Sequence, residues 1–162
     1  MFKTGDKVFY PMHGAGIVTG IEQNVFDGTM LDYYVLSIPI SNLQITVQVE
    51  KAERMGLRNI NPKDTVDKIV KNASPIEMSS NWSERYKNNL EILKGGDLLK
   101  ITEVFKTLIL RERIKSLSTA EKKLLTTARQ LIVTEIILSH NTDKQSAETL
   151  LNNTIQAMAV TA

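Results

Sequence analysis

The chain has 162 residues, of which 42% are apolar, 23% charged and 6% aromatic, a composition that supports folded cores and argues against disorder. Twenty Lys and Arg against eighteen Asp and Glu give a net charge of +2, which by itself indicates no partner. The absence of cysteine excludes disulfides, thiolate zinc sites and a cysteine nucleophile. No apolar run reaches the roughly 18 residues of a membrane span, and no signal-peptide pattern opens the chain, so we expect a cytoplasmic protein.

The first part of the chain has the pattern of short β-strands. Apolar residues come in β-branched or aromatic runs that glycine and proline interrupt. Asp27-Gly28 and Ser41-Asn42 provide hairpin-type turns between them. Because so many short strands cannot leave many edges unpaired, residues 1–55 are predicted to form a small curled β-barrel. The expected strands cover 7–10, 16–18, 30–38 and 43–49.

Residues 60–162 have a helical period and are predicted to form an all-α bundle, which makes the protein an α+β protein of two domains. Pro62 suits the start of a first helix. Residues 81–84 (NWSE) and 118–121 (STAE) read as capping boxes, in which the first side chain caps the helix and the glutamate reaches back. Gly95-Gly96 ends the helix that begins at residue 82, and a last helix is expected from about 146 to 158.

Signals for catalysis are weak. The chain has two histidines, His13 and His140, and neither lies in a metal-ligand spacing. The segment 14–16 (GAG) lacks the third glycine and the Lys-Ser/Thr of a phosphate loop, so we interpret it as a turn. We therefore expect no enzymatic activity, no metal and no cofactor.

Trp82 is the only tryptophan, and the capping pattern places it at the first helical position, ahead of the apolar stripe of its helix. Arg85 and Lys87 lie within one turn, where they could reach a phosphate backbone. An exposed indole between cations is suited to an unstacked base or a base step. The alternative is an indole that packs the start of the helix onto its own bundle, and the residues alone do not decide between the two.

The positive charge is concentrated in the helical part. Residues 81–123 contain ten Lys and Arg against six acidic residues, a net +4, whereas the first sixty residues have a net charge of −1. A solvated helix face explains this excess as well as a phosphate-binding face does.

Three separated segments, in the same order, resemble the CarD/CdnL family of bacterial transcription regulators. They are 1–16 (MFKTGDKVFYPMHGAG), 81–90 (NWSERYKNNL) and 117–131, which includes LSTAEKKLL and ARQL. The resemblance implies a Tudor-like barrel that binds the β subunit of RNA polymerase, and a helical domain that touches promoter DNA at the upstream edge of the melted bubble. Trp82 matches the family's minor-groove wedge, with Arg85, Tyr86 and Lys87 as neighbouring DNA contacts. The implied outcome is a longer-lived open complex, at ribosomal RNA promoters among others, in a protein associated with the nucleoid.

The same resemblance places polymerase contacts on the third and fourth predicted strands and the preceding hairpin, at Asn24, Leu36, Thr46 and Gln48, although Leu36 also fits a core position. Several relatives have Arg at the positions of Asn24 and Thr46, and many have Pro at that of Gln48. Glu84 replaces a second Arg of some relatives, and an acid beside the wedge weakens the attraction for phosphate.

Another class of function remains open on the sequence alone. In it, the barrel docks on polymerase or a repair translocase, and the helical part recruits a further protein without touching DNA. We expect a monomer that does not associate with membranes, and a domain-swapped dimer through the linker 52–62 is conceivable in a crystal.

Overall fold

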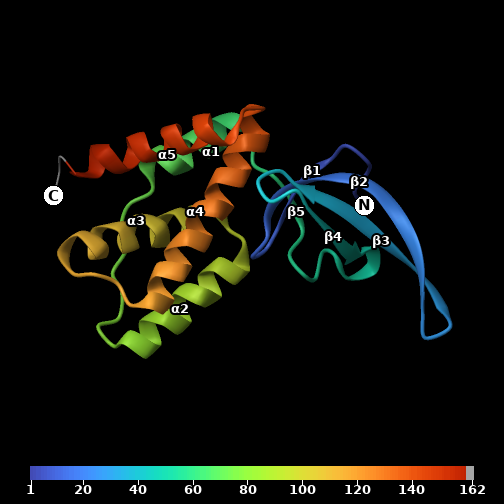
Figure 1. Ribbon diagram of the computed structural model, residues 1–162, viewed down its shortest axis with the longest axis horizontal. Coiled ribbons are helices and arrows are strands. Elements are labelled where there is room, and N and C mark those ends of the chain that lie inside the picture. Colours follow the sequence, from blue (N-terminus) through green and yellow to red (C-terminus); the bar gives the residue numbers. More distant parts are fainter. Residues whose placement is uncertain (160–162) are drawn as a thin grey trace.

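The computed structural model describes residues 1–159 and consists of an antiparallel sheet followed by a helical bundle (Figure 1). The prediction of a two-domain α+β protein is confirmed. The strands are β1 (Lys7–Tyr10), β2 (Gly14–Phe26), β3 (Thr29–Ile38), β4 (Leu43–Gln48) and β5 (Arg58–Asn59), with a 3-10 turn at Val49–Lys51. The helices are α1 (Lys63–Asn72), α2 (Trp82–Gly95), α3 (Leu98–Ile114), α4 (Thr119–His140) and α5 (Lys144–Ala159).

The five strands form one sheet in the order β4-β3-β2-β1-β5, and all neighbours are antiparallel. β5 lies between the predicted domains 1–55 and 60–162 and completes the sheet by pairing with β1. The sheet curls around its own small core, formed by residues such as Val8, Tyr34 and Leu36. β4 and β5 are its two outer strands.

The hairpin of β2 and β3 is longer than predicted. The expected strand 16–18 is part of a 13-residue strand, Gly14–Phe26, whose outer half is exposed. That half mixes polar and apolar residues and contacts no core, so it lacks the regular alternation of a half-buried strand. The hairpin turn at Asp27-Gly28 is confirmed, with φ values of 51° and 77°. The hairpin projects away from the helices (Figure 1).

The predicted helix caps at Asn81 and Ser118 are confirmed, and Asp97 caps α3 in the same way. Each of these side chains accepts the backbone N–H three residues on, and Gly96 ends α2 in the left-handed region with φ 75°. The reciprocal half of the two capping boxes is not formed. The N–H of Asn81 bonds to the Ser79 hydroxyl, and both carboxylate oxygens of Glu121 bind Arg85. α5 begins at Lys144, slightly before the predicted start.

The two domains share a tightly packed interface. Phe9 and Ala15 of the sheet belong to the same apolar cluster as the helical core. The N–H of Ala15 donates to the Thr134 hydroxyl of α4 at 2.9 Å. Gly14 must be glycine here, because its φ is 104° and a Cβ would lie 2.6 Å from the Thr134 Oγ1. Residues 14–16, interpreted as a turn, thus open β2 and pack against α4.

Arg58 and Glu135 bind the domains together at the same interface. The guanidinium of Arg58 donates to both carboxylate oxygens of the fully buried Glu135, at 3.1 and 2.8 Å. Asn61 adds two further hydrogen bonds to the same carboxylate. Arg58 also covers the ring of Phe9 and donates to the carbonyl of Gly96 at the end of α2. The carboxyl end of α2 and the later part of α4 are thereby fixed to the sheet. Among residues 1–159, no helix is long and apolar enough to cross a membrane.

Candidate nucleic-acid interface

Trp82 is the first residue of α2, as the sequence predicted, and 46% of it is exposed. Its ring stacks on Tyr86 one turn later, with centroids 5.7 Å apart and an angle of 13° between the planes. The indole Nε1–H donates to the Ser118 Oγ at 2.9 Å. The ring is therefore held on one face and at one edge, and it is not packed among the leucines of the bundle.

Ser118 holds the indole because α2 and α4 begin side by side. Its hydroxyl caps α4 by accepting the N–H of Glu121 at 3.2 Å, and it accepts the indole N–H as well. The sequence pattern predicted the cap but missed the contact with Trp82. Trp82 and Ser118 are 36 residues apart in the chain, and only the packing of α2 against α4 brings them together.

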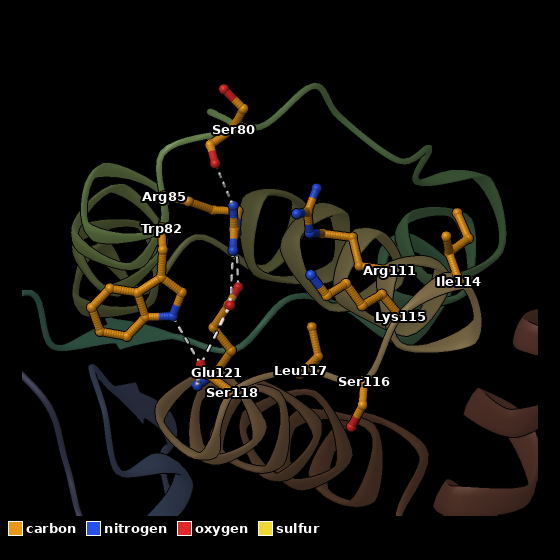
Figure 2. A pocket seen from close by; sticks show the side chains of 10 residues that line it. All are labelled: Ser80, Trp82, Arg85, Arg111, Ile114, Lys115, Ser116, Leu117, Ser118 and Glu121. Atoms are coloured by element: carbon orange, nitrogen blue, oxygen red, sulfur yellow. Dashed lines mark hydrogen bonds and ion pairs between the residues drawn. The ribbon is translucent and has the colours of Figure 1, made fainter.

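Arg85 lies elsewhere than predicted. It is 7% exposed, and its guanidinium donates to both carboxylate oxygens of Glu121, each at 2.9 Å (Figure 2). It also donates to the carbonyls of Ser79 and Ser80. The prediction that Arg85 shares an exposed face with Lys87 is wrong, because the buried carboxylate draws the guanidinium inward.

The Arg85–Glu121 pair also sets the charge at this site. The hydrogen bond from Arg85 holds the pKa of Glu121 below its usual range, against the opposing effect of burial. The same bond raises the pKa of Arg85. Both groups are charged at neutral pH and neutralise one another, so Arg85 functions as a positioning residue for the start of α2.

The remaining predicted DNA-contact residues divide between two roles. Lys87 is exposed on α2, where its ammonium group is accessible. Tyr86 is half-buried and packs against the helical core while its ring supports the indole. Glu84 is exposed on the first turn, and its backbone N–H is bonded to the Asn81 side chain.

On the sheet, the predicted polymerase contacts fall on both faces. Side chains alternate along a strand, and the register pairs Asn24 with Leu31, Thr46 with Val35 and Gln48 with Tyr33. Asn24, Thr46 and Gln48 therefore lie on one face. Leu36 lies on the opposite face, fully buried in the core of the sheet, so its predicted role as a direct contact is contradicted.

Comparison with known proteins divides the chain in the same way as the fold. Residues 2–61 match the CarD-like/TRCF RID domain, and residues 66–152 match the C-terminal domain of CarD. The chain is also 31% identical over 148 residues to "Putative transcription factor YdeB" of Bacillus subtilis (strain 168), a match that spans 90% of this chain and 97% of that protein. The chain belongs to the CarD family. It is an RNA polymerase-interacting transcription factor and not an enzyme.

The two histidines make contacts within the fold. His13 is exposed at the corner before β2 and stacks on Tyr10, with ring centroids 5.0 Å apart. His140 ends α4 and contacts Asp67 of α1 at 2.6 Å, which ties two helices together. In the part of the chain that the structure describes, no group of three or more metal-ligating side chains is found.

Proposed function

We propose that this CarD-family protein prolongs the life of the open promoter complex. Its RID domain binds the β subunit of RNA polymerase, and Trp82 contacts DNA at the upstream edge of the melted region. The observation that carries the proposal is the half-exposed indole at the free end of α2, held from behind by Tyr86 and Ser118.

The energy available from one indole suits this task. The protein shifts the equilibrium between closed and open promoter only if it binds the open form better. Stacking of a base on an aromatic ring contributes about 1–3 kcal/mol, which corresponds to a change of roughly five- to hundredfold in the ratio of the two states. Because Tyr86 and Ser118 already fix the ring, little conformational entropy is lost when DNA binds.

Modest affinity for DNA is sufficient in this arrangement. Lys87 lies on the same helix as Trp82 and supplies sequence-independent attraction to backbone phosphates. Docking of the RID domain on polymerase raises the effective concentration of promoter DNA near the indole. The small net charge of +2 is therefore compatible with a DNA contact.

The fold holds Trp82 at a defined position relative to the RID domain, which supports the proposal. Gly96 at the end of α2 adjoins Pro11 and Phe9 of the sheet. Trp82 lies at the other end of the 14-residue helix, which corresponds to about 20 Å along its axis. Since Arg58 and Glu135 hold the same end of α2 and α4 on the sheet, the indole takes a defined position relative to a polymerase-bound RID domain.

For the polymerase contact, we propose the outer edge and adjoining face of the sheet. β4 is an outer strand, and such an edge can add to a strand of a partner, with backbone hydrogen bonds supplying much of the affinity. Thr46 and Gln48 lie on β4, and Asn24 extends the same face along the hairpin. The exposed apolar residues Val25 and Phe26 at the hairpin tip enlarge this surface.

Trp82→Ala tests the DNA contact. We expect the variant to stay folded and to lose about 1–3 kcal/mol of unfolding free energy, because a ring-on-ring contact and one hydrogen bond are removed. The lifetime of open complexes formed by purified bacterial RNA polymerase on a linear promoter fragment should fall roughly five- to hundredfold relative to wild type. Trp82→Phe should give an open-complex lifetime between those of wild type and Trp82→Ala, because an aromatic ring remains but the hydrogen bond to Ser118 is lost.

Leu99→Ala is a matched control, since Leu99 is apolar and 43% exposed but lies at the start of α3. It should leave the lifetime unchanged. If Trp82→Ala binds polymerase and gives wild-type lifetimes, the DNA contact is refuted and the protein acts as a pure protein–protein adaptor.

A further inference from the structure

A cavity of about 690 Å³ adjoins the indole on the side that faces α3. Its walls come from the beginnings of α2 and α4 and from the end of α3 (Figure 2). The side chains that decide its chemistry are Trp82, Arg85, Arg111, Lys115, Ser118 and Glu121.

The charges around this cavity do not cancel. Arg85 and Glu121 neutralise each other through their two-point ion pair. Arg111 and Lys115 remain, and Figure 2 shows their charged ends directed into the space opposite Arg85. Within residues 1–159, neither forms a side-chain hydrogen bond or a salt bridge, although Arg111 is close enough to Glu121 to help lower the pKa of that carboxyl. The cavity therefore carries an excess of two positive charges.

The walls of the cavity are held in place without a ligand. The turn between α3 and α4 is closed by the N–H of Leu117, which donates to the Glu112 carboxylate at 2.8 Å. Lys115 caps the end of α3 through its backbone N–H, and the indole is fixed to Ser118. The cations are thus presented by a rigid frame, which reduces the entropy lost on binding.

We propose that this cavity binds a backbone phosphate of the DNA strand next to Trp82, with Arg111 and Lys115 as the binding cations. The proposal rests on the DNA contact proposed above and names the phosphate-binding residues at that site. A nucleotide that stacks on the indole carries a phosphate within reach of the adjoining cavity, where two cations and no free acid face it. Ile114, 87% exposed at the rim, offers apolar contact to a sugar or base and favours a nucleotide over a bare ion.

This assignment replaces Arg85 as the source of positive charge beside the indole. The sequence placed a cation one turn from the indole, but Glu121 engages that cation fully. Arg111 and Lys115 follow 26 and 30 residues later in the chain and reach the same site through the packing of α3 against α2. They supply the accessible charge that Arg85 does not.

The test is binding of the full chain to a forked DNA fragment that carries a short unpaired tract, measured over a range of salt concentrations. Trp82 is the only tryptophan and lines the cavity, so its fluorescence reports occupancy directly. The double variant Arg111→Gln/Lys115→Gln should bind about tenfold more weakly at low salt, since charge-assisted hydrogen bonds are lost. Its salt dependence should be less steep by about 0.7–0.9, the value for one phosphate.

Lys100→Gln is the matched control. It removes one positive charge, as Lys115→Gln alone does, but Lys100 is exposed near the start of α3, about 22 Å along the axis from Lys115. It should change neither affinity nor salt slope. Lys115→Gln alone, at an exposed position, should give part of the effect without any loss of thermal stability, so the test does not depend on the tolerance of Arg111 to substitution.

The outcomes separate this inference from the proposed function. If Trp82→Ala shortens open-complex lifetime while the double variant binds forked DNA like Lys100→Gln, the DNA contact stands and the cavity assignment is refuted. If wild type shows no affinity for forked DNA and Trp82→Ala has no effect, both are refuted. A saturable change of Trp82 fluorescence with low-millimolar inorganic phosphate, absent from the double variant, would assign the cavity to a free anion and overturn its assignment to DNA.

Discussion

The two ends of the α2–α4 helix pair carry similar ion pairs in different surroundings. Glu121 and Glu135 both lie on α4, 14 residues or about 21 Å apart, and each is bound at two points by an arginine. At the outer end, Arg85 and Glu121 join α2 to α4 within the helical domain. At the sheet end, Arg58 and Glu135 join the helical domain to the sheet.

The difference lies in what each pair holds. The outer pair makes its additional hydrogen bonds within the helical domain, where Arg85 also donates to the carbonyls of Ser79 and Ser80 just before α2. The sheet pair is extended by Asn61 and by the Gly96 carbonyl, so that it fixes both helices to the RID domain. The outer pair therefore fixes the orientation of the indole, and the sheet pair fixes the position of the helical domain relative to the RID domain. Substitutions in the outer pair should therefore affect the indole, and substitutions in the sheet pair should affect the joining of the two domains.

The largest loss of stability is expected for Glu135→Ala. This carboxylate is fully buried and accepts four hydrogen bonds, and its removal leaves Arg58 without its partner. The free energy of unfolding should fall by about 3–5 kcal/mol in urea titrations followed by Trp82 fluorescence. Glu148→Ala is the control, since Glu148 pairs with Lys144 on the surface of α5 and should cost no more than about 0.5 kcal/mol. Equal losses would show that the sheet pair does not join the domains energetically.

Arg85→Ala should cost about 3 kcal/mol, because Glu121 stays buried without its ion-pair partner. Replacing both members, as Arg85→Met with Glu121→Leu, should recover most of that loss, since no buried charge remains. The double variant should also change the response to acid. The pKa of Glu121 is lowered by folding, so wild-type stability from this group is present at neutral pH and is lost as the pH falls through and below the usual glutamate range.

Urea titrations at neutral and acidic pH measure both effects. The wild-type protein should lose more stability on acidification than the Arg85→Met/Glu121→Leu variant does. If the two lose the same amount, Glu121 is not the group responsible.

Local signals in the sequence were sufficient for much of this architecture. The caps at Asn81 and Ser118, and with them the terminal position of Trp82, depend on groups within four residues of one another, so the sequence pattern predicts them. The burial of Arg85 depends on a glutamate 36 residues away, and no local pattern reports that pairing. Leu36 could have been assigned correctly from strand alternation, because its parity along the strand opposes that of the residues paired with Thr46 and Gln48.

A smaller loss of stability than at either ion pair is expected for Ser118→Ala, which tests the outer end alone. The variant loses the cap of α4 and the acceptor of the indole N–H, so the free energy of unfolding should fall by about 1–2 kcal/mol. Asp97→Ala removes the equivalent cap from α3 without touching the indole, and should cost about 1 kcal/mol. Only Ser118→Ala should alter Trp82 fluorescence and shorten open-complex lifetime, because only there does the ring lose its fixed orientation. Matching lifetimes in the two variants would mean that stacking on Tyr86 is enough to present the indole.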